Sequence, residues 1–283
     1  MNDSNLAPLA RPADTPEVRH FQWGLGLHES CQYNFFCGDR FFCVRQIELR
    51  DFVHQSAWYY DGEVREVLNT ADPIERLGEG RLNTHTPRFH MTSDDEKGAL
   101  VAMDASDNPV FEISWTIPIS SSWGTPGDGS GMHQPLLQGE VNFQGETLTG
   151  PGYCKRAWFD QDPECFAWRF IEGTFDDGAA MVWTADAFFG LKSYDYFKIA
   201  HVDGTIAEAD NEHTHHRNSI AYGNIDGRSF EAEVESIGEW DTRLKGGAFD
   251  TLLVQRFSRL TVRCDGKEHH GHALHEVGGG MMR

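Results

Sequence analysis

The chain has 283 residues, which is long enough for one large domain or two of ordinary size. Its 24 Lys and Arg against 44 Asp and Glu give a formal net charge of −20, and such a chain repels nucleic-acid phosphates and anionic membrane surfaces. Hydrophobic residues make up 39% of the sequence, enough for a core, yet no apolar run approaches the roughly 20 residues of a membrane span. We therefore expect no nucleic-acid partner and no membrane span.

The first residues, MNDSNLAPLARPADTPEV, are polar and Pro-rich and lack a positive segment followed by an apolar one. We expect residues 1–17 to form a flexible tail, with no signal peptide. The cysteines are scattered and lack any CxxC spacing, so they predict reduced thiols and a cytoplasmic protein rather than a zinc ribbon or a disulfide framework. They are Cys31, Cys37, Cys43, Cys154, Cys165 and Cys264.

The rest of the chain is a succession of strand and turn patterns. Asp-Gly pairs are a strong hairpin signal, and several stand between stretches rich in aromatic and β-branched residues. The pairs are Asp61-Gly62, Asp177-Gly178, Asp203-Gly204, Asp226-Gly227 and Asp265-Gly266, and Gln144-Gly145 indicates one more turn. Because helical periodicity is nearly absent, the sequence predicts an antiparallel all-β fold.

One long Gly/Ser/Pro stretch, PISSSWGTPGDGSGMHQP over Pro118–Pro135, divides the strands into two groups. Strands at this density need a closed or doubled sheet, because exposed edges aggregate. We interpret the stretch as a linker between an N-terminal β unit at 18–134 and a C-terminal β unit at 135–283. The alternative is a long surface loop within a single β-sandwich.

The segment GPGYCKRAWFDQDPECFAWRFIEGTFDDGAAMVWTADAFF at 150–189 resembles a signature of the carotenoid 1,2-hydratase (hydroxyneurosporene synthase) family and its bacterial relatives. Gly150, Gly152 and Tyr153 match the opening of the signature. Trp158 matches its aromatic position, and Trp168 matches the Trp-rich strand that ends in Asp-Gly. The closing HGHALHEVGG also resembles the last strand of those relatives, where a Glu often follows a run of small residues.

This resemblance implies two lipocalin-like antiparallel β-barrel or sandwich units packed together. It also implies an enzyme that adds water across an isolated double bond with a protein acid and no cofactor. One departure concerns the residues after Tyr153, where the family usually carries acidic or histidine side chains and this chain has Cys154, Lys155 and Arg156.

Alkene hydration by a protein acid needs a proton-loaded carboxyl or imidazole in an apolar cavity, with aromatic faces around it. Alternation along a strand places Glu172 on one face with Phe166, Trp168, Phe170 and Thr174, where burial would raise its pKa. Glu172 is therefore our first candidate for the catalytic acid. The alternative is a solvent-facing Glu172 that pairs with a Lys or Arg.

Further candidates surround this strand in the sequence. The catalytic candidates besides Glu172 are Asp160, Lys155 and His275, and the substrate-binding candidates are Tyr153, Arg156, Trp158, Trp168, Trp183 and His85. Alternation in GYCKRAW predicts Tyr153 and Lys155 on one side of the strand and Arg156 on the other. Arg156 stays charged and is suited to anchor an acidic or oxygen-rich substrate end, whereas a buried Lys155 could act as a base.

The histidines permit a rival hypothesis. His213 and His215 share one strand face in EHTHHR, and His270 and His272 share another near the end of the chain. Two such strands side by side could hold Zn or Fe as in a cupin-like barrel enzyme, although no correctly spaced carboxylate accompanies them.

We assign no metal and no cofactor to this sequence. The leading prediction is a cofactor-independent lyase, hydratase or isomerase that acts on a hydrophobic small molecule of isoprenoid, steroid-like or aromatic type in a β-barrel cavity. The alternatives are a non-catalytic carrier of such ligands and the metal-dependent barrel enzyme.

Overall fold

The computed structural model of the protein describes an all-β chain, which confirms the predicted fold class. The described residues are 28–49, 52–73, 84–86, 89–93, 96–104, 106–119, 122–124, 131–133, 136–159, 165–178, 180–189, 192–201, 206–208, 213–216, 219–225, 228–246, 249–264 and 266–282. Within these ranges all the regular structure is strand, and every strand pair is antiparallel where the register is given. Among them no helix is long and apolar enough to cross a membrane.

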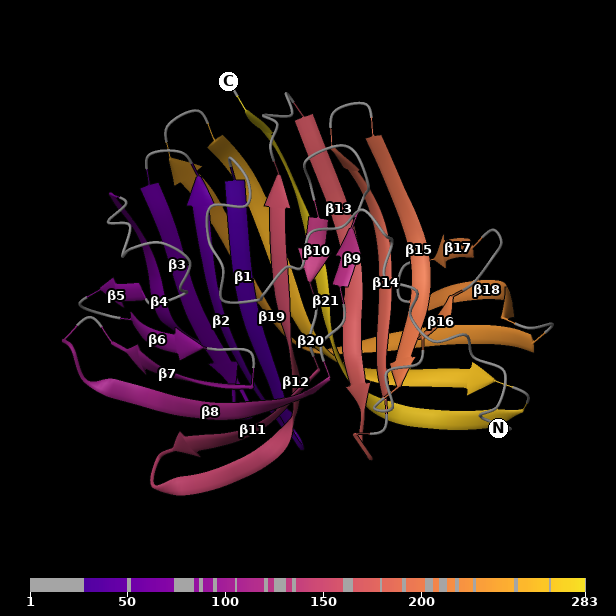
Figure 1. Ribbon diagram of the computed structural model, residues 1–283, viewed down its shortest axis with the longest axis horizontal. Coiled ribbons are helices and arrows are strands. Elements are labelled where there is room, and N and C mark those ends of the chain that lie inside the picture. The colour runs from indigo at the N-terminus through magenta and orange to yellow at the C-terminus, as the bar shows by residue number, and fades with distance from the viewer. Residues whose placement is uncertain are drawn as a thin grey trace. The chain divides into compact units, whose positions relative to one another are not determined.

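Twelve strands form the first sheet (Figure 1). They are β1 (His28–Cys37), β2 (Arg40–Leu49), β3 (Phe52–Tyr60), β4 (Val64–Pro73), β5 (Thr84–Thr86), β6 (Phe89–Ser93), β7 (Lys97–Met103), β8 (Pro109–Ile119), β9 (Ser122–Gly124), β10 (Gly131–His133), β11 (Leu136–Phe143) and β12 (Glu146–Phe159). The pairing order is β4-β3-β2-β1-β12-β11-β8-β7-β6-β5, with the β9–β10 hairpin attached to β12. The sheet curls, so that β4 comes back close to β7.

Nine strands form the second sheet, in the order β16-β15-β14-β13-β21-β20-β19-β18-β17. They are β13 (Cys165–Phe175), β14 (Ala180–Phe189), β15 (Lys192–His201), β16 (Ile206–Glu208), β17 (His213–His216), β18 (Ser219–Ile225), β19 (Arg228–Gly246), β20 (Phe249–Cys264) and β21 (Lys267–Met282). Both sheets therefore follow one plan. Most strands pair with a neighbour in the chain as a hairpin, although β4 and β5 lie at opposite edges of the first sheet and β16 and β17 at opposite edges of the second. The first strand of each sheet pairs with its last, β1 with β12 and β13 with β21.

Several of the sequence-predicted turns join these strands. Gly62 and Gly178 take positive φ angles of 81° and 66° at the β3–β4 and β13–β14 turns. At the β11–β12 turn both central residues do so, Gln144 at 52° and Gly145 at 82°. Two successive positive φ values match the twist of the flanking strands in a tight hairpin. Asp203-Gly204 and Asp226-Gly227 lie outside the described residues.

The chain divides into two compact units, and the second comprises Pro163–Arg243 and Thr251–Met281. The boundary between the two β units was predicted from the sequence at 134/135, within the Gly/Ser/Pro stretch. Strands β11 and β12, at 136–159, instead belong to the first sheet, because β11 pairs with β8 and β12 pairs with β1. Part of the expected linker forms the β9–β10 hairpin on β12.

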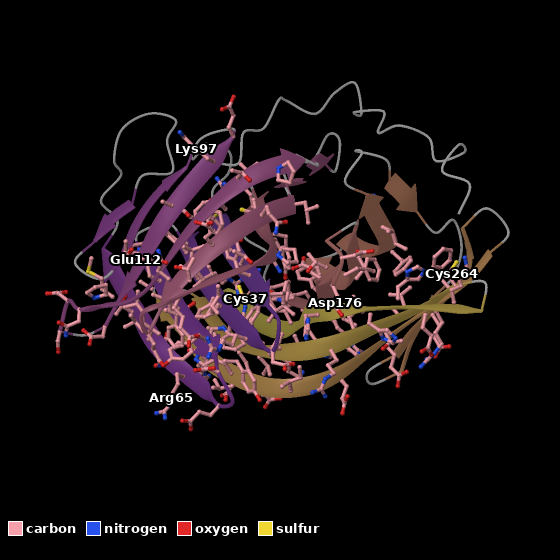
Figure 2. All side chains as sticks on the ribbon, turned by 90° about the horizontal axis from the view of Figure 1, so that it is seen from below. Cys37, Arg65, Lys97, Glu112, Asp176 and Cys264 are labelled. Carbon is pink, nitrogen blue, oxygen red and sulfur yellow. The ribbon has the colours of Figure 1, made fainter. Side chains whose placement is uncertain are left out.

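An aromatic cluster fills the interior of the first unit. Phe42 packs edge-on against Phe111 and Phe143, with ring centroids 5.3 Å apart in both pairs. Tyr33 lies 4.6 Å from Trp115. Glycines make room for these rings, since a Cβ on Gly139 or Gly152 would collide with the ring of Phe35. Figure 2 shows Cys37 within this unit, whereas the exposed Arg65 and Lys97 extend away from it.

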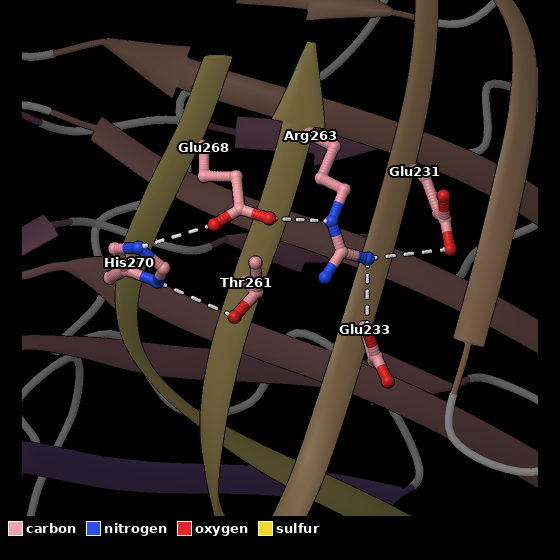
Figure 3. Close-up of polar contacts among 6 residues, drawn as sticks. All are labelled: Glu231, Glu233, Thr261, Arg263, Glu268 and His270. Atoms are coloured by element: carbon pink, nitrogen blue, oxygen red, sulfur yellow. Dashed lines mark hydrogen bonds and ion pairs between the residues drawn. The ribbon is translucent and has the colours of Figure 1, made fainter. Parts of the chain in front are cut away.

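The second unit has its own apolar cluster on one face of the second sheet. It consists of Ile171, Phe175, Val182, Phe197, Ile199, Phe230, Ala232, Val234, Leu260, Val262, Cys264 and Ala273. The opposite face of β19, β20 and β21 carries exposed charges there (Figure 3). Arg263 forms ion pairs with Glu231, Glu233 and Glu268.

Candidate active site

One face of β13 joins a buried carboxyl to a row of aromatic rings. Glu172 is 0% exposed, and Trp168, Phe170 and Thr174 on the same face are also buried. Glu172 lies directly opposite Leu274 of β21 and Trp183 of β14, so the face continues onto both neighbouring strands. The alternation predicted for this strand therefore places Glu172 on a buried face of the second sheet.

The aromatic rings along β13 stack on one another. Phe166 and Trp168 are nearly parallel, at 13° with centroids 5.7 Å apart, and Trp168 and Phe170 lie at 25° and 6.5 Å. Rings at positions i and i+2 of a strand thus form an aromatic row on the face that carries Glu172. An aromatic surface of this kind stabilises a positive charge that develops in a bound molecule.

Glu276 is a second buried carboxylate on this face. Its Oε1 accepts a hydrogen bond from Trp168 Nε1 at 2.8 Å, and its Oε2 accepts one from Gln255 Nε2 of β20 at 2.7 Å. Glu276 is 1% exposed and lies opposite Phe170 in the β13–β21 register. Because both donors are N–H groups, one on each oxygen, they favour the ionised carboxylate and fix its orientation.

Gly278 makes this hydrogen bond sterically possible. It lies opposite Trp168 across the β13–β21 pair, and a Cβ at this position would overlap the six-membered ring of the indole. The sequence E-V-G at 276–278 thus places a carboxylate and the space for its indole donor on one face, two residues apart. This is a physical reason for the glycine two positions after Glu276.

The two carboxyl groups form a diagonal pair. Glu172 is opposite Leu274, which is two residues from Glu276 on the same strand and the same face. Diagonal neighbours in an antiparallel pair are about 7 Å apart at their backbones, within reach of long side chains such as those of two glutamates. Two carboxyl groups in different local environments can divide the roles of acid and base between them.

The catalytic candidate His275 lies on the other face of β21. It is opposite Ile171, a member of the apolar cluster, and its Nε2 contacts Arg169 Nε at 3.1 Å. The strand register therefore turns His275 away from Glu172. The structure does not bring these two predicted catalytic residues together, because adjacent positions of a strand point to opposite faces.

Besides Trp158, three other candidates lie on β12 in the first unit. Tyr153 and Lys155 share a face with Asn34 and Gln32, which stand directly opposite them on β1. Arg156 points to the opposite face, as alternation predicts. All three β12 side chains are buried.

Arg156 lies on the same face of the first sheet as the thiols of Cys31 and Cys154. Its guanidinium is 0% exposed, and Nη1 donates to the carbonyl oxygens of Ser30 and Ala157, each at 3.1 Å. The two Sγ atoms are 3.4 Å apart, and burial raises the pKa of Cys154 well above its usual value. Arg156 thus binds the main chain beside the Cys31 and Cys154 side chains.

Three of the remaining candidates are placed by the pairing of their strands. Trp183 lies opposite Glu172 on β14, Trp158 lies opposite Glu29 on β1, and His85 lies opposite His90 in the β5–β6 pair. Asp160 is outside the described residues. Among the described residues, no three or more His, Cys, Asp or Glu side chains are arranged to hold a metal ion.

Glu276 and Gln255 are the candidate site residues that sequence reasoning did not select. Local alternation groups residues along one strand only, whereas Trp168 and Glu276 are joined by a strand pair 108 positions apart. The one available signal was the HEVGG segment, in which an acidic residue precedes glycine by two positions.

Comparison with solved structures supports a known fold. The chain is similar to kievitone hydratase from Nectria haematococca, with a TM-score of 0.59 and 12% identity over 89% of this chain and 88% of that one. It is also similar to a putative AttH from Nitrosomonas europaea (TM-score 0.62, 13% identity, 96% and 99% covered) and to CghA in complex with Sch210972 (0.54, 10%, 90% and 88%). No family model and no curated protein matches the sequence. At these identities the likeness establishes the fold.

Proposed function

We propose that the protein is a cofactor-independent hydro-lyase, or an isomerase, that uses Glu172 and Glu276 as an acid–base pair on an unsaturated small molecule. The observation that carries this proposal is the hydrogen-bonded Glu276 carboxylate on the same buried face as Glu172 and the stacked Trp168 ring. The similarity of the fold to kievitone hydratase adds support.

In the hydration direction, Glu172 gives its proton to one alkene carbon. The positive charge that develops on the other carbon is stabilised by the π faces of Trp168 and Phe170 and by the Glu276 anion. Water adds to that carbon and passes a proton to Glu276, and proton transfer through water returns Glu172 to its acid form. Dehydration is the same sequence in reverse. In isomerisation, Glu276 removes a proton from a neighbouring carbon instead of from water.

The character of this face suggests the substrate class. Three stacked rings favour a flat, apolar body, and the carboxyl pair requires a double bond or a hydroxyl group beside it. An isoprenoid, a steroid-like molecule or an alkenylated aromatic meets both requirements.

Two carboxamide variants test the proposal. A panel of such alkenes and of the corresponding tertiary alcohols is incubated with the protein, and product is followed by mass spectrometry. On a substrate that the wild type converts, Glu172→Gln should lower kcat by at least about 100-fold, and Glu276→Gln by about 100-fold or more. Glu112→Gln is the matched control, because Glu112 is exposed on β8 and its replacement should leave kcat unchanged.

A carrier without catalytic activity gives a different result. It would bind members of the panel and convert none of them, and Glu172→Gln would leave binding unaltered. Conversion that persists at wild-type rates in both carboxamide variants would contradict the acid–base assignment.

A further inference from the structure

A row of buried polar side chains crosses four strands of the first sheet. Lys155 of β12, Gln32 of β1, Arg45 of β2 and Ser56 of β3 are directly opposite one another in the strand registers. None of the four is more than 7% exposed. They lie on the face opposite the aromatic cluster, since Gln32 alternates with Cys31 and Tyr33 of that cluster. Two cations and an amide are thus buried side by side.

A second row of larger side chains lies beside the first. Tyr153, Asn34, Cys43 and Trp58 are opposite one another on the same four strands, and all of them are buried. Gln32 Nε2 donates to Asn34 Oδ1 at 3.1 Å, which joins the two rows. Aromatic rings therefore border an amide pair that is fully removed from solvent.

The amide pair keeps hydrogen-bonding capacity that the described part of the chain does not use. Gln32 Oε1 and Asn34 Nδ2 are buried and have no hydrogen-bond partner there. If both amides were turned over, Asn34 would donate to Gln32 and the outer atoms would exchange roles. In either orientation the pair offers one acceptor and one donor.

His54 adds a second acceptor on this face. Its Nε2 is 2.9 Å from Asn69 Oδ1, and Asn69 Nδ2 donates to Glu66 Oε2 at 3.1 Å, which orients the Asn69 amide. Nε2 is therefore the protonated nitrogen, and the buried Nδ1 has no partner among the described residues. His54 lies opposite Ile47, two positions along β2 from Arg45.

The stability of the fold does not explain why these buried polar atoms have no partner among the described residues. A buried polar atom without a partner costs about 1–3 kcal/mol, and apolar side chains of the same shape would avoid that cost. In native proteins each such group calls for an explanation, such as a strained or catalytic role or a partner that binds there, whether a water, an ion or a ligand.

We propose that Gln32 and Asn34 form a binding site for an oxygenated aromatic small molecule. One hydroxyl of the ligand donates to the free amide oxygen, and a carbonyl or hydroxyl oxygen accepts from the free amide N–H. Lys155 and Arg45, which flank Gln32, favour an electron-rich ligand oxygen such as that of a phenol or an enol. The neighbouring Tyr153 and Trp58 rings favour an aromatic body. This site requires no proton transfer and goes beyond the proposed reaction.

The experiment uses 4-hydroxyacetophenone, which carries both a phenol and a ketone, with 4-ethyltoluene as its apolar counterpart. Calorimetric titration of the full chain should show binding of the first at least about tenfold tighter than the second. The double variant Gln32→Met, Asn34→Leu keeps shape and volume, and it should lose this preference. Its melting temperature should equal or exceed that of the wild type, because the unpartnered atoms are gone.

Two controls separate ligand binding by this amide pair from a structural role and from the proposed reaction. Gln55→Met removes a hydrogen bond between two side-chain amides, since Gln55 Nε2 donates to Gln46 Oε1 at 3.2 Å. It should lower the melting temperature by about 3 °C and leave binding intact. Glu172→Gln should also bind normally, so failure of the proposed reaction and failure of this site are distinguishable.

Three results would overturn the inference. The first is equal binding of the two probes by the wild type. The second is an unchanged preference for 4-hydroxyacetophenone in the double variant. The third is a melting temperature of the double variant that falls as far as that of Gln55→Met, which would make the pair structural.

Discussion

Replacing Trp168 by Phe tests the hydrogen bond that orients Glu276. The substitution keeps an aromatic ring between Phe166 and Phe170 but removes the indole N–H, which donates to Glu276 Oε1 at 2.8 Å. Glu276 is 1% exposed, so its oxygen would be left buried without this donor. A hydrogen bond to a buried charged group contributes about 1.5–3 kcal/mol. We expect about 2 kcal/mol of lost stability from this bond.

Trp115→Phe is the matched control. Trp115 is also buried within a β unit and packs against aromatic rings, but its Nε1 has no hydrogen-bond partner among the described residues. Both variants lose the same atoms, and only one loses a hydrogen bond. Thermal unfolding followed by circular dichroism should therefore show Trp168→Phe melting about 5 °C below Trp115→Phe.

The same substitution should affect catalysis. If the indole holds Glu276 in position, kcat on a converted substrate should fall about 10- to 30-fold in Trp168→Phe and stay unchanged in Trp115→Phe. Equal melting temperatures of the two variants would refute the assigned hydrogen bond. A kcat unaffected by Trp168→Phe would refute its role in positioning Glu276.

Three further predictions concern single side chains. Gly278→Ala should displace the Trp168 ring and lower the free energy of unfolding by about 1–3 kcal/mol. Gly279→Ala should lower it less, because its Cβ would meet its nearest neighbour only at 3.3 Å. Chemical denaturation of the two variants measures the difference. Burial lowers the pKa of His54 from 6.5 to about 4, so the unfolded chain gains its proton first as pH falls. As pH falls from 6.5 to 4, protonation of His54 in the unfolded chain lowers the free energy of unfolding by about 3 kcal/mol. In His54→Gln the free energy of unfolding should therefore change less with pH over that window. Hydrogen bonds to Glu268 and Glu233 raise the pKa of the exposed Arg263, and Arg263→Gln should lower the melting temperature only slightly, with no difference left in about 1 M NaCl.

Local sequence pattern was sufficient for the strands and for the strand faces that several candidate residues take. Alternation placed Glu172 with Trp168 and Phe170, and it separated Tyr153 and Lys155 from Arg156. These inferences concern neighbours along one strand, where a side-chain period of two decides which face each residue takes. The turns at Gly62 and Gly178 were predictable for the same local reason, since a positive φ there favours glycine.

Pairing between distant strands was not predictable in this way. His275 was grouped with Glu172 as a catalytic residue, but the β13–β21 register sets it opposite Ile171 and on the other face. The Gly/Ser/Pro stretch suggested a linker by its composition, yet β11 returns from it to pair with β8. In both cases hydrogen bonding between strands decides the outcome, and composition and local period carry no information about it.

The most direct measurement of the central claim is the origin of the proton that the protein adds to carbon. A converted alkene is incubated with the protein in D2O, and the product alcohol is analysed by mass spectrometry and NMR. The acid–base pair predicts one deuterium on the carbon next to the new hydroxyl-bearing carbon, with incorporation lost in Glu172→Gln and retained in Glu112→Gln. A product without carbon-bound deuterium, or the same incorporation in Glu172→Gln as in the wild type, would contradict the account.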